Sequence, residues 1–327
     1  MNIPEIKYCP GTLAEGFDTY SQTCLNRVFG GKKVSHLLPY ASPSSNQETD
    51  KLFNDNRKRM SISGVQEKYS FILDKNKLRL INEGERGTYI LKPIPNAGNR
   101  ADQMPANEHL TMQIARQIYN IETAENALIF FNNGAQAYIT KRFDAKEDGS
   151  KWAQDDFASL DRRTPQTHGE NYKYLGNYLE LFQLMQTYIP AYKLESLKLY
   201  KIILFNYLFS NGDAHFKNFS LLETPLGDYR LSPAYDLLNS RIHIDDRDFA
   251  LEDGLLPKKL AQGKINHQLI VLAEQAGIGE KQTKDIFDLL TSGSERVEKL
   301  IAASFLNEST KRNYLQAYRT RLKQILK

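Results

Sequence analysis

The chain has 327 residues, of which 41% are hydrophobic, enough for a packed core in two modest domains or one two-lobed enzyme. Its formal net charge of +4 is small for this length and argues against a dedicated nucleic-acid-binding protein. No apolar run approaches the roughly 18 residues of a membrane span, and the N-terminus lacks the apolar core of a signal peptide. The two cysteines, Cys9 and Cys24, do not make a disulfide framework, so we expect a soluble cytoplasmic protein.

The first half of the chain carries β-strand patterns. Residues 1–50 end in a stretch rich in Ser, Pro, Asn and Gln, and we expect them to pack on the part that follows or lead into it. A helix is predicted at 104–118 from its apolar spacing, and Asn132-Asn133-Gly134 predicts a hairpin. Short β-prone runs separated by turn residues predict an antiparallel meander at 69–73, 78–81 and 88–92.

The pattern becomes helical after about residue 150. Two short β-prone pieces, 219–222 and 229–231, interrupt it. Helices are predicted at 174–187, 194–209, 269–275, 282–290 and 309–326. The sequence therefore predicts an α+β fold with a β-rich N-terminal lobe at 51–145 and a helical C-terminal lobe at 146–327. This is the plan of a bilobal kinase, with nucleotide between the lobes.

One loop carries residue types suited to phosphoryl transfer. Asp213 and Asn218 form a D-x-x-x-x-N pattern, and Asp236 follows the next strand pair. Phosphoryl transfer needs one carboxylate to accept the proton of the attacking hydroxyl, and an amide oxygen and a further carboxylate to hold magnesium. The pattern predicts that Asp213 accepts the proton and that Asn218 and Asp236 hold magnesium, with ATP and Mg²⁺ as cofactors. The alternative is that both aspartates are ordinary turn residues, since Asn-Gly-Asp is a turn composition.

Two more polar residues lie inside this loop. Lys217 could neutralise the transferring phosphoryl group as a point charge. His215 could hold the loop by hydrogen bonds, in a structural or a catalytic role. A zinc site is not expected, because no cysteine or second histidine lies at ligand spacing.

The β-rich half offers candidates for phosphate binding. Lys92 ends an apolar strand and could clamp the α- and β-phosphates, or it could be a solvated edge residue. Glu108 could pair with Lys92, or it could simply favour the start of its helix. The stretch Ser-Ile-Ser-Gly-Val-Gln-Glu-Lys at 61–68 could fold over phosphates with its backbone N–H groups.

Together these segments resemble the HipA family of bacterial serine/threonine kinase toxins, from about residue 55 to the end of the chain. The resemblance rests on 61–68, Tyr-Ile-Leu-Lys-Pro at 89–93, Asn107-Glu108, Thr-Lys-Arg-Phe-Asp at 140–144, 211–220 and Leu-Ser-Pro-Ala-Tyr-Asp-Leu at 231–237.

The resemblance implies a role for each matched residue. Asp213 would be the catalytic base, Asn218 and Asp236 the magnesium ligands, and Lys92 a phosphate ligand. A phosphate loop would comprise Ser63, Gly64, Val65, Gln66, Glu67 and Lys68. Beside adenine would lie the hinge residues Lys141, Arg142 and Phe143, and the nucleotide site would also be lined by His215, Lys217 and Tyr235.

The chain is too short for the extra N-terminal subdomain of full-length HipA and resembles the compact HipT type, whose phosphate loop carries a Ser-x-Ser pair. This implies a toxin of a HipBST- or HipBA-like toxin–antitoxin system that autophosphorylates on Ser61 or Ser63. Its partners would be a HipB-like antitoxin and a small HipS-like protein, with DNA contacted only through the antitoxin. Its target would be a protein such as an aminoacyl-tRNA synthetase. Cys9-Pro10-Gly11-Thr12 lacks a second cysteine, so no metal is expected there.

Two other functions fit parts of the pattern. A small-molecule kinase of the aminoglycoside phosphotransferase type also uses Gly-Asp-x-x-x-x-Asn followed by a later Asp, but the Ser61–Lys68 stretch and the Ala-His-x-Lys-Asn-Phe core favour the HipA type. A repressor component with little catalysis is the second alternative, which the intact Asp213, Asn218 and Asp236 argue against.

Overall fold

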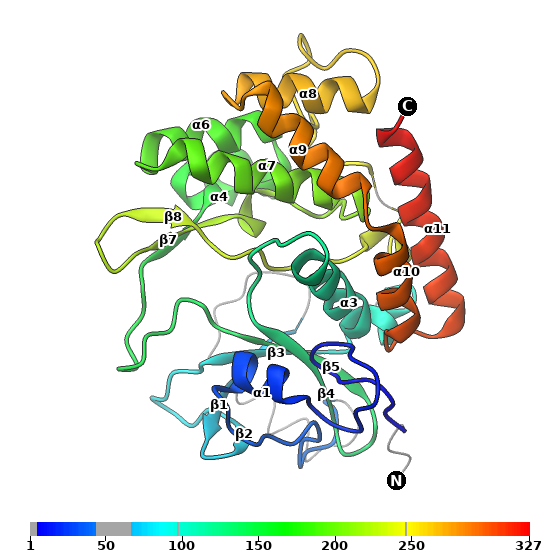
Figure 1. Cartoon of the computed structure of the whole chain (residues 1–327). Helices are drawn as coiled ribbons and strands as arrows, with labels where there is room; N and C mark the ends of the chain where they lie inside the picture. The colour runs from blue at the N-terminus through cyan, green and yellow to red at the C-terminus, as the bar shows by residue number, and fades with distance from the viewer. Residues whose placement is uncertain (1–4, 44–66, 97, 246) are drawn as a thin grey trace.

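The computed structural model describes residues 5–43, 67–96, 98–245 and 247–327. Figure 1 shows a larger β-sheet toward one end of the molecule and most of the helices toward the other, with helix α3 (Met104–Gln117) between them. This arrangement agrees with the predicted α+β fold.

The larger sheet is antiparallel throughout, with the strand order β2-β1-β3-β5-β4. Its strands are β1 (Tyr69–Asp74), β2 (Lys77–Leu80), β3 (Tyr89–Pro93), β4 (Asn126–Phe130) and β5 (Gln136–Lys141). The three strands predicted at 69–73, 78–81 and 88–92 and the predicted hairpin are therefore confirmed. The prediction of a meander was wrong, because β3 pairs with β1 rather than with β2. Because side chains alternate along a strand, Ala127 and Ile129 enter one apolar core while Leu128 enters another. Both faces of the sheet are thus covered, one of them by α3.

The N-terminal segment covers the other face. Its helix α1 (Gln22–Phe29) starts at Ser21, whose hydroxyl accepts from the N–H of Cys24, and it ends at Gly30 in the left-handed conformation. The carbonyl of Pro10 accepts a hydrogen bond from the N–H of Leu128 at 2.8 Å, which ties this segment to β4. Cys9 and Cys24 both belong to this segment and are free, buried thiols.

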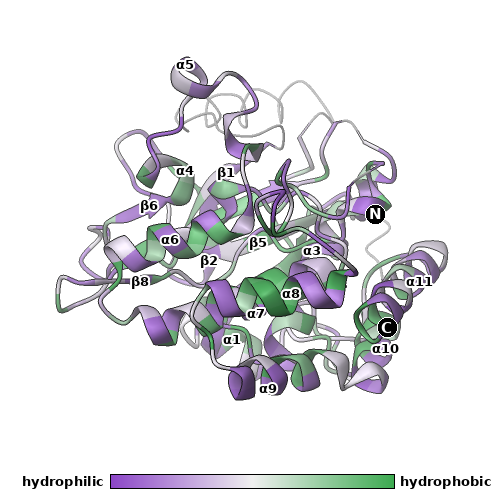
Figure 2. Cartoon of the chain, turned by 90° about the horizontal axis from the view of Figure 1, so that it is seen from above, coloured by the Kyte–Doolittle hydropathy of each residue, from purple (hydrophilic) through white to green (hydrophobic). Residues whose placement is uncertain are grey.

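The rest of the chain is mostly helical. Its helices are α4 (Phe157–Leu160), α5 (Pro165–His168), α6 (Tyr178–Tyr188), α7 (Tyr192–Leu208), α8 (Ile265–Gln275), α9 (Glu280–Thr291), α10 (Ser294–Ala303) and α11 (Glu308–Ile325). Single 3-10 turns occur at η1 (Ala101–Gln103), η2 (Tyr172–Tyr174), η3 (Phe216–Asn218) and η4 (Ser240–Ile242). Helix α5 has no buried residue, and Figure 2 shows it standing at the edge of the molecule.

A second, three-stranded sheet supports the loop that carries Asp213. Its order is β6 (Gln154–Asp156), β7 (Ser220–Glu223) and β8 (Tyr229–Leu231). The sequence patterns predict β7 and β8 but not β6, α1 or α10. Within the described ranges, no helix is long and apolar enough to cross a membrane.

The helix predicted at 174–187 begins later than expected. Tyr174 ends η2, and α6 starts only at Tyr178. Asn177 and Glu180 form a capping box at that start, and Gly176 is in the left-handed conformation at φ 83°. The prediction was wrong for residues 174–177, because apolar spacing extended the helix through a turn that this local chemistry breaks.

The close packing of the N-terminal segment on α1 gives a stability prediction. A methyl group added at Gly11 would collide with the side chain of Cys24, whose Cβ lies 2.9 Å from the new carbon. Because both residues are buried, we expect Gly11→Ala to destabilise the fold by about 1–3 kcal/mol in urea unfolding. The control is Gly279→Ala, whose new methyl meets the end of the flexible Gln282 side chain. Equal stability of the two variants would contradict this packing.

Candidate active site

A buried lysine held between two carboxylates forms the centre of the site. Lys92 Nζ, from β3, lies 2.6 Å from Glu108 Oε1 on α3 and 2.5 Å from Asp236 Oδ1. Lys92 and Glu108 are 4% and 2% exposed, so this pair is shielded from solvent. Of the two possibilities that the sequence leaves open for Glu108, the structure contains the pairing with Lys92. Asp236 reaches the same amine from the segment after β8.

The charges of this cluster follow from burial and pairing. Burial opposes ionisation of Asp236, but Lys92 and Lys68 outweigh it and lower the pKa of the carboxyl below its ordinary value. Burial also opposes the charge of Lys92, yet Asp236 and Glu108 raise its pKa. For Glu108 burial dominates over Lys92, so its pKa is raised. The lysines therefore favour the ionised form of Asp236, which is the form that binds a cation.

Asp236 also has an uncommon backbone conformation. Its φ of 56° lies in the left-handed region, which costs most residues free energy but suits Asp and Asn better than others. Ser210, just before the Asp213 loop, shares this conformation at φ 55°. The side-chain amide of Asn211 donates to the backbone carbonyl of Asp236 at 3.4 Å, so the two turns are joined. Backbone strain thus collects where the candidate residues meet.

The loop after α7 brings Asn218 next to Asp236. Asn218 Nδ2 donates to Asp236 Oδ2 at 3.4 Å, and its Oδ1 accepts from the N–H of His215 at 3.0 Å. Lys68 Nζ approaches the same Asp236 oxygen at 4.0 Å. An amide and a carboxylate side by side suit magnesium, which takes few protein ligands when phosphates supply the rest. Within the part of the chain that the structure describes, no three His, Cys, Asp or Glu side chains gather as a metal site.

Asp213 lies on the more open side of the loop. Its side chain is 48% exposed and its Oδ1 accepts from the Tyr174 hydroxyl at 2.9 Å. Lys217 Nζ lies 3.5 Å from the Tyr172 hydroxyl and 3.8 Å from Asp156 Oδ2. The sequence analysis did not single out either tyrosine or Asp156. The only signal was an Asn-Tyr-Lys-Tyr stretch, which has no helical or strand period.

His215 is a neutral side chain in this setting. It is 6% exposed, and burial, reinforced by Lys173, lowers its pKa to about 3. Its Nε2 lies 4.0 Å from Asp213, and the Tyr174 ring packs edge-on at 5.0 Å between centroids. His215 is thus in contact with Asp213 through its ring and with Asn218 through its backbone N–H.

A cavity of about 180 Å³ opens beside Lys92 and Asp236. Phe143 and Tyr235 form part of its wall with ring centroids 5.8 Å apart, and Arg142 is held by Asp144 at 2.7 Å. The cavity is lined by Lys68, Ile90, Lys92, Ala124, Thr140, Lys141, Arg142, Phe143, Asp144, Gln154, Tyr235 and Asp236. Aromatic and apolar walls with a lysine and a carboxylate at one end suit a flat ring that carries an anionic group.

Part of the expected phosphate loop cannot be placed. Ser61, Ser63, Gly64, Val65 and Gln66 lie outside the described residues. Glu67 accepts a hydrogen bond from the Tyr69 hydroxyl at 2.7 Å, and Lys68 lines the cavity.

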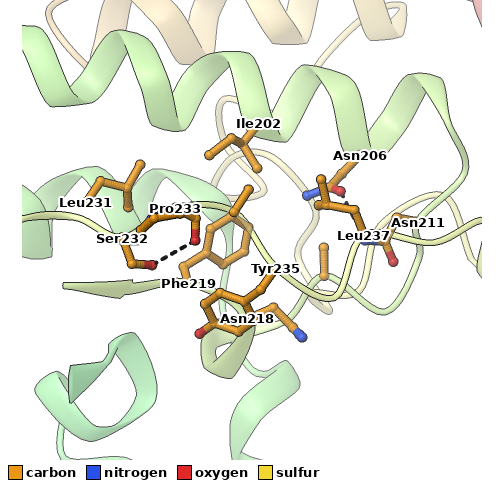
Figure 3. A pocket seen from close by; sticks show the side chains of 12 residues that line it. Ile202, Asn206, Asn211, Asn218, Phe219, Leu231, Ser232, Pro233, Tyr235 and Leu237 are labelled. Atoms are coloured by element: carbon orange, nitrogen blue, oxygen red, sulfur yellow. Dashed lines mark hydrogen bonds between the residues drawn. The ribbon is translucent and has the colours of Figure 1, made fainter. Parts of the chain in front are cut away.

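A second, much smaller cavity lies behind the loop (Figure 3). It measures about 10 Å³ between Ile202, Asn218, Leu231 and Tyr235, too small for more than a water molecule. The Tyr235 hydroxyl donates to the carbonyl of Lys217 at 2.9 Å, which fastens the loop on that side. This region is packing behind the site rather than a ligand pocket.

Asn239 and Ser240, which follow the turn at Asp236, connect the parts of the site. The Asn107 side chain, next to Glu108 on α3, bonds both the N–H and the C=O of Asn239, at 3.0 and 2.9 Å. The Ser240 hydroxyl accepts from the N–H of Gly212 at 2.8 Å and donates to the carbonyl of Ser210 at 3.0 Å. These buried bonds join α3, the Asp236 segment and the Asp213 loop.

Comparison with known sequences gives consistent matches. A family model described as HipA-like C-terminal domain matches residues 60–298. A Haemophilus influenzae protein named Putative kinase is 24% identical over 98% of this chain and 97% of its own length. Putative kinase Y4dM of Sinorhizobium fredii is 30% identical, over 70% of this chain and 57% of that protein. The chain therefore spans a little more than half of the Sinorhizobium relative.

Solved structures show the same fold. A chain from the Shewanella oneidensis toxin–antitoxin complex of HipA, HipB and operator DNA matches with a TM-score of 0.63 at 18% identity, covering 88% of this chain and 72% of that one. The Helicobacter pylori proinflammatory kinase CtkA matches with a TM-score of 0.52 at 14% identity, covering 77% and 92%. The predicted kinase-like fold is confirmed by these likenesses.

The buried neutral imidazole of His215 predicts a pH dependence of stability. Its pKa of about 3 in the fold lies below the value of about 6.5 in the unfolded chain, so below pH 6.5 the unfolded state binds the proton first. The contribution to stability is complete above pH 6.5 and is lost as the pH falls, by at most about 1.4 kcal/mol per pH unit. Urea unfolding at pH 7 and pH 5 should show a smaller loss for His215→Gln than for the wild type. An equal loss would mean that His215 is charged in the fold.

Proposed function

Because the chain belongs to the HipA-like C-terminal domain family, we propose that it is an ATP- and Mg²⁺-dependent serine/threonine protein kinase. The observation that carries this proposal is the Lys92–Glu108–Asp236 cluster, with Asn218 beside Asp236 and Asp213 on the same loop. A buried lysine paired with a helix glutamate, next to a metal-binding carboxylate, is the arrangement on which kinase catalysis depends. The names of the Haemophilus and Sinorhizobium relatives support the kinase part of this proposal.

In this proposal each side chain has a defined task. Asp213 accepts the proton of the attacking hydroxyl while that oxygen bonds to the γ-phosphorus and the bond to ADP breaks. Lys92 and Lys217 offset the negative charge of the phosphates. Asn218 and Asp236 would hold Mg²⁺, which neutralises charge on the phosphate oxygens when bound.

The cavity would receive the nucleotide base. The hinge residues Lys141, Arg142 and Phe143 would lie beside adenine, with Tyr235 opposite Phe143. Lys68, at the end of the proposed phosphate loop, is near enough to Asp236 to contact the phosphates. Residues 51–145 would form the N-terminal lobe and 146–327 the helical lobe, with 1–50 as an extension.

The biological role that we propose is that of a HipT-like toxin in a HipBA- or HipBST-like system. The Shewanella complex supports a HipB-like antitoxin as partner, since that structure holds HipA, HipB and operator DNA. A small HipS-like protein would be a second partner, and this chain would reach DNA only through the antitoxin. The substrate would be a cytoplasmic protein, for which we propose an aminoacyl-tRNA synthetase.

The assigned roles predict the effect of two isosteric changes. Asp213→Asn removes the proton acceptor and Asp236→Asn removes a metal-binding charge, so each should lower phosphate transfer from labelled ATP by about a hundredfold or more. Asp236→Asn should also raise the Mg²⁺ concentration that gives half-maximal transfer. The measurement is incorporation of label into the chain and into proteins of a cell lysate.

The matched control is Asp285→Asn on the exposed face of α9, which should retain wild-type transfer. Labelling by Asp213→Asn and Asp236→Asn at the wild-type rate would refute both roles.

The Ser61–Ser63 pair predicts a site of self-modification. A phosphate adds about −1.5 to −2 charge and would repel ATP or pair with Arg57, Lys58 and Arg59 upstream. After incubation with ATP, mass spectrometry should find phosphate on Ser61 or Ser63, and the double change to Ala should abolish that signal. Ser309→Ala, at an exposed position in the first turn of α11, serves as the control. An unmodified loop in a wild type that phosphorylates another protein would exclude autophosphorylation there.

A further inference from the structure

One short stretch of chain, Tyr172–Tyr178, contacts four of the five loop residues from Asp213 to Lys217. The hydroxyl of Tyr174 donates to Asp213 at 2.9 Å, that of Tyr178 donates to the carbonyl of Ala214 at 2.7 Å, and that of Tyr172 lies 3.5 Å from Lys217 Nζ. The Tyr174 ring also packs against the ring of His215.

The remaining loop residue, Phe216, is covered by a buried arginine. The guanidinium of Arg163 lies 3.8 Å from the centre of the Phe216 ring, and its side chain is 7% exposed. It also donates to the carbonyl of Leu175 and to Glu180, each at 2.5 Å. Its Nε also donates to Asp161 Oδ2 at 2.6 Å. Arg163 therefore joins the start of α6 to the loop through its contacts with Leu175, Glu180 and the Phe216 ring.

The backbone of this stretch is itself anchored. The carbonyl of Tyr174 accepts from the N–H of Glu252 at 2.9 Å, and that of Gly176 accepts from Asp253 at 3.0 Å. A segment held at its backbone and by Arg163 can fix the side chains that it presents. It is a rigid support rather than a loosely attached loop.

We propose that Tyr172–Tyr178 is a positioning element for the loop and that Tyr174 is a positioning residue that orients the Asp213 carboxylate. The proposal rests on the proposed function, in which Asp213 receives the proton of the attacking hydroxyl. The bond from Tyr174 restricts rotation of the carboxylate, so its orientation is set before the acceptor arrives. The edge-on ring holds His215 at the same time.

The test is Tyr174→Phe, which removes the hydroxyl and keeps the ring on His215. We expect kcat for transfer of labelled γ-phosphate, to the chain itself or to water, to fall roughly tenfold to a hundredfold, with the KM for ATP within about twofold of wild type. A fall in kcat that a comparably destabilised control does not share is the signature of a positioning residue, because a smaller folded fraction would lower the apparent kcat of both variants and leave KM unchanged.

The matched control is Tyr200→Phe. Tyr200 is buried, whereas Tyr174 is half-buried, and the Tyr200 hydroxyl donates to the carbonyl of Leu269 at 2.9 Å, away from the loop. Tyr200→Phe removes one tyrosine hydrogen bond, as Tyr174→Phe does, and should lose at least as much thermal stability while keeping kcat. A fall in kcat of Tyr174→Phe alone supports the proposal.

Two results would overturn the proposal. One is an unchanged kcat for Tyr174→Phe, and the other is an equal fall in both variants, which would indicate general destabilisation. In either case the proposed function stands as long as the wild type transfers phosphate. A wild type that binds no ATP in calorimetry would overturn the proposed function and this inference together.

Discussion

The structure depends on how one buried ammonium group is neutralised. Lys92 cannot keep its charge at 4% exposure without acceptors, and it finds two, Glu108 on α3 and Asp236 from the segment after β8. Strand, helix and loop come from three separate parts of the chain, so pairing this charge brings the large sheet against the helical half. Removing either carboxylate leaves a buried charge partly unpaired, which costs several kcal/mol in comparable cases. The lysine also favours the ionised form of Asp236 beside Asn218, as the proposed magnesium site requires.

Asn107, Asn239 and Ser240 extend this constraint. Asn107, the neighbour of Glu108 on α3, forms two hydrogen bonds with the backbone of Asn239, one through its side-chain oxygen and one through its side-chain nitrogen. These bonds help to hold Glu108 beside Lys92. Ser240 then carries the connection to the start of the Asp213 loop. In many kinases the helix that bears the glutamate moves between active and inactive positions. Here the N-terminal turn of α3 is hydrogen-bonded to the segment that bears Asp236, so the helix and the proposed metal ligand are expected to move together.

The sequence alone was sufficient where residue type identifies a candidate residue or where apolar spacing identifies a helix or strand. Asp213, Asn218 and Asp236 could be found from residue type and order, and the strands and long helices from their spacing. The pairing of Lys92 could not be decided, because Asp236 lies 144 positions along the chain and only the packed fold brings it near. Tyr174 was assigned to a helix, since apolar spacing cannot reveal the turn at Gly176 or the contact with Asp213. The roles of the site residues, including those of Ser61 and Ser63, stay predictions.

The left-handed backbone at Asp236 limits which amino acids this position can accommodate. Glycine accepts this conformation freely but brings no ligand, and glutamate brings a carboxylate on a longer stem without a preference for the turn. Asparagine keeps the shape and gives up the charge. The residue at this position must therefore meet two requirements. It must adopt the left-handed conformation that joins it to the Asn211 turn, and it must carry the negative charge that Lys92 requires. Aspartate meets both.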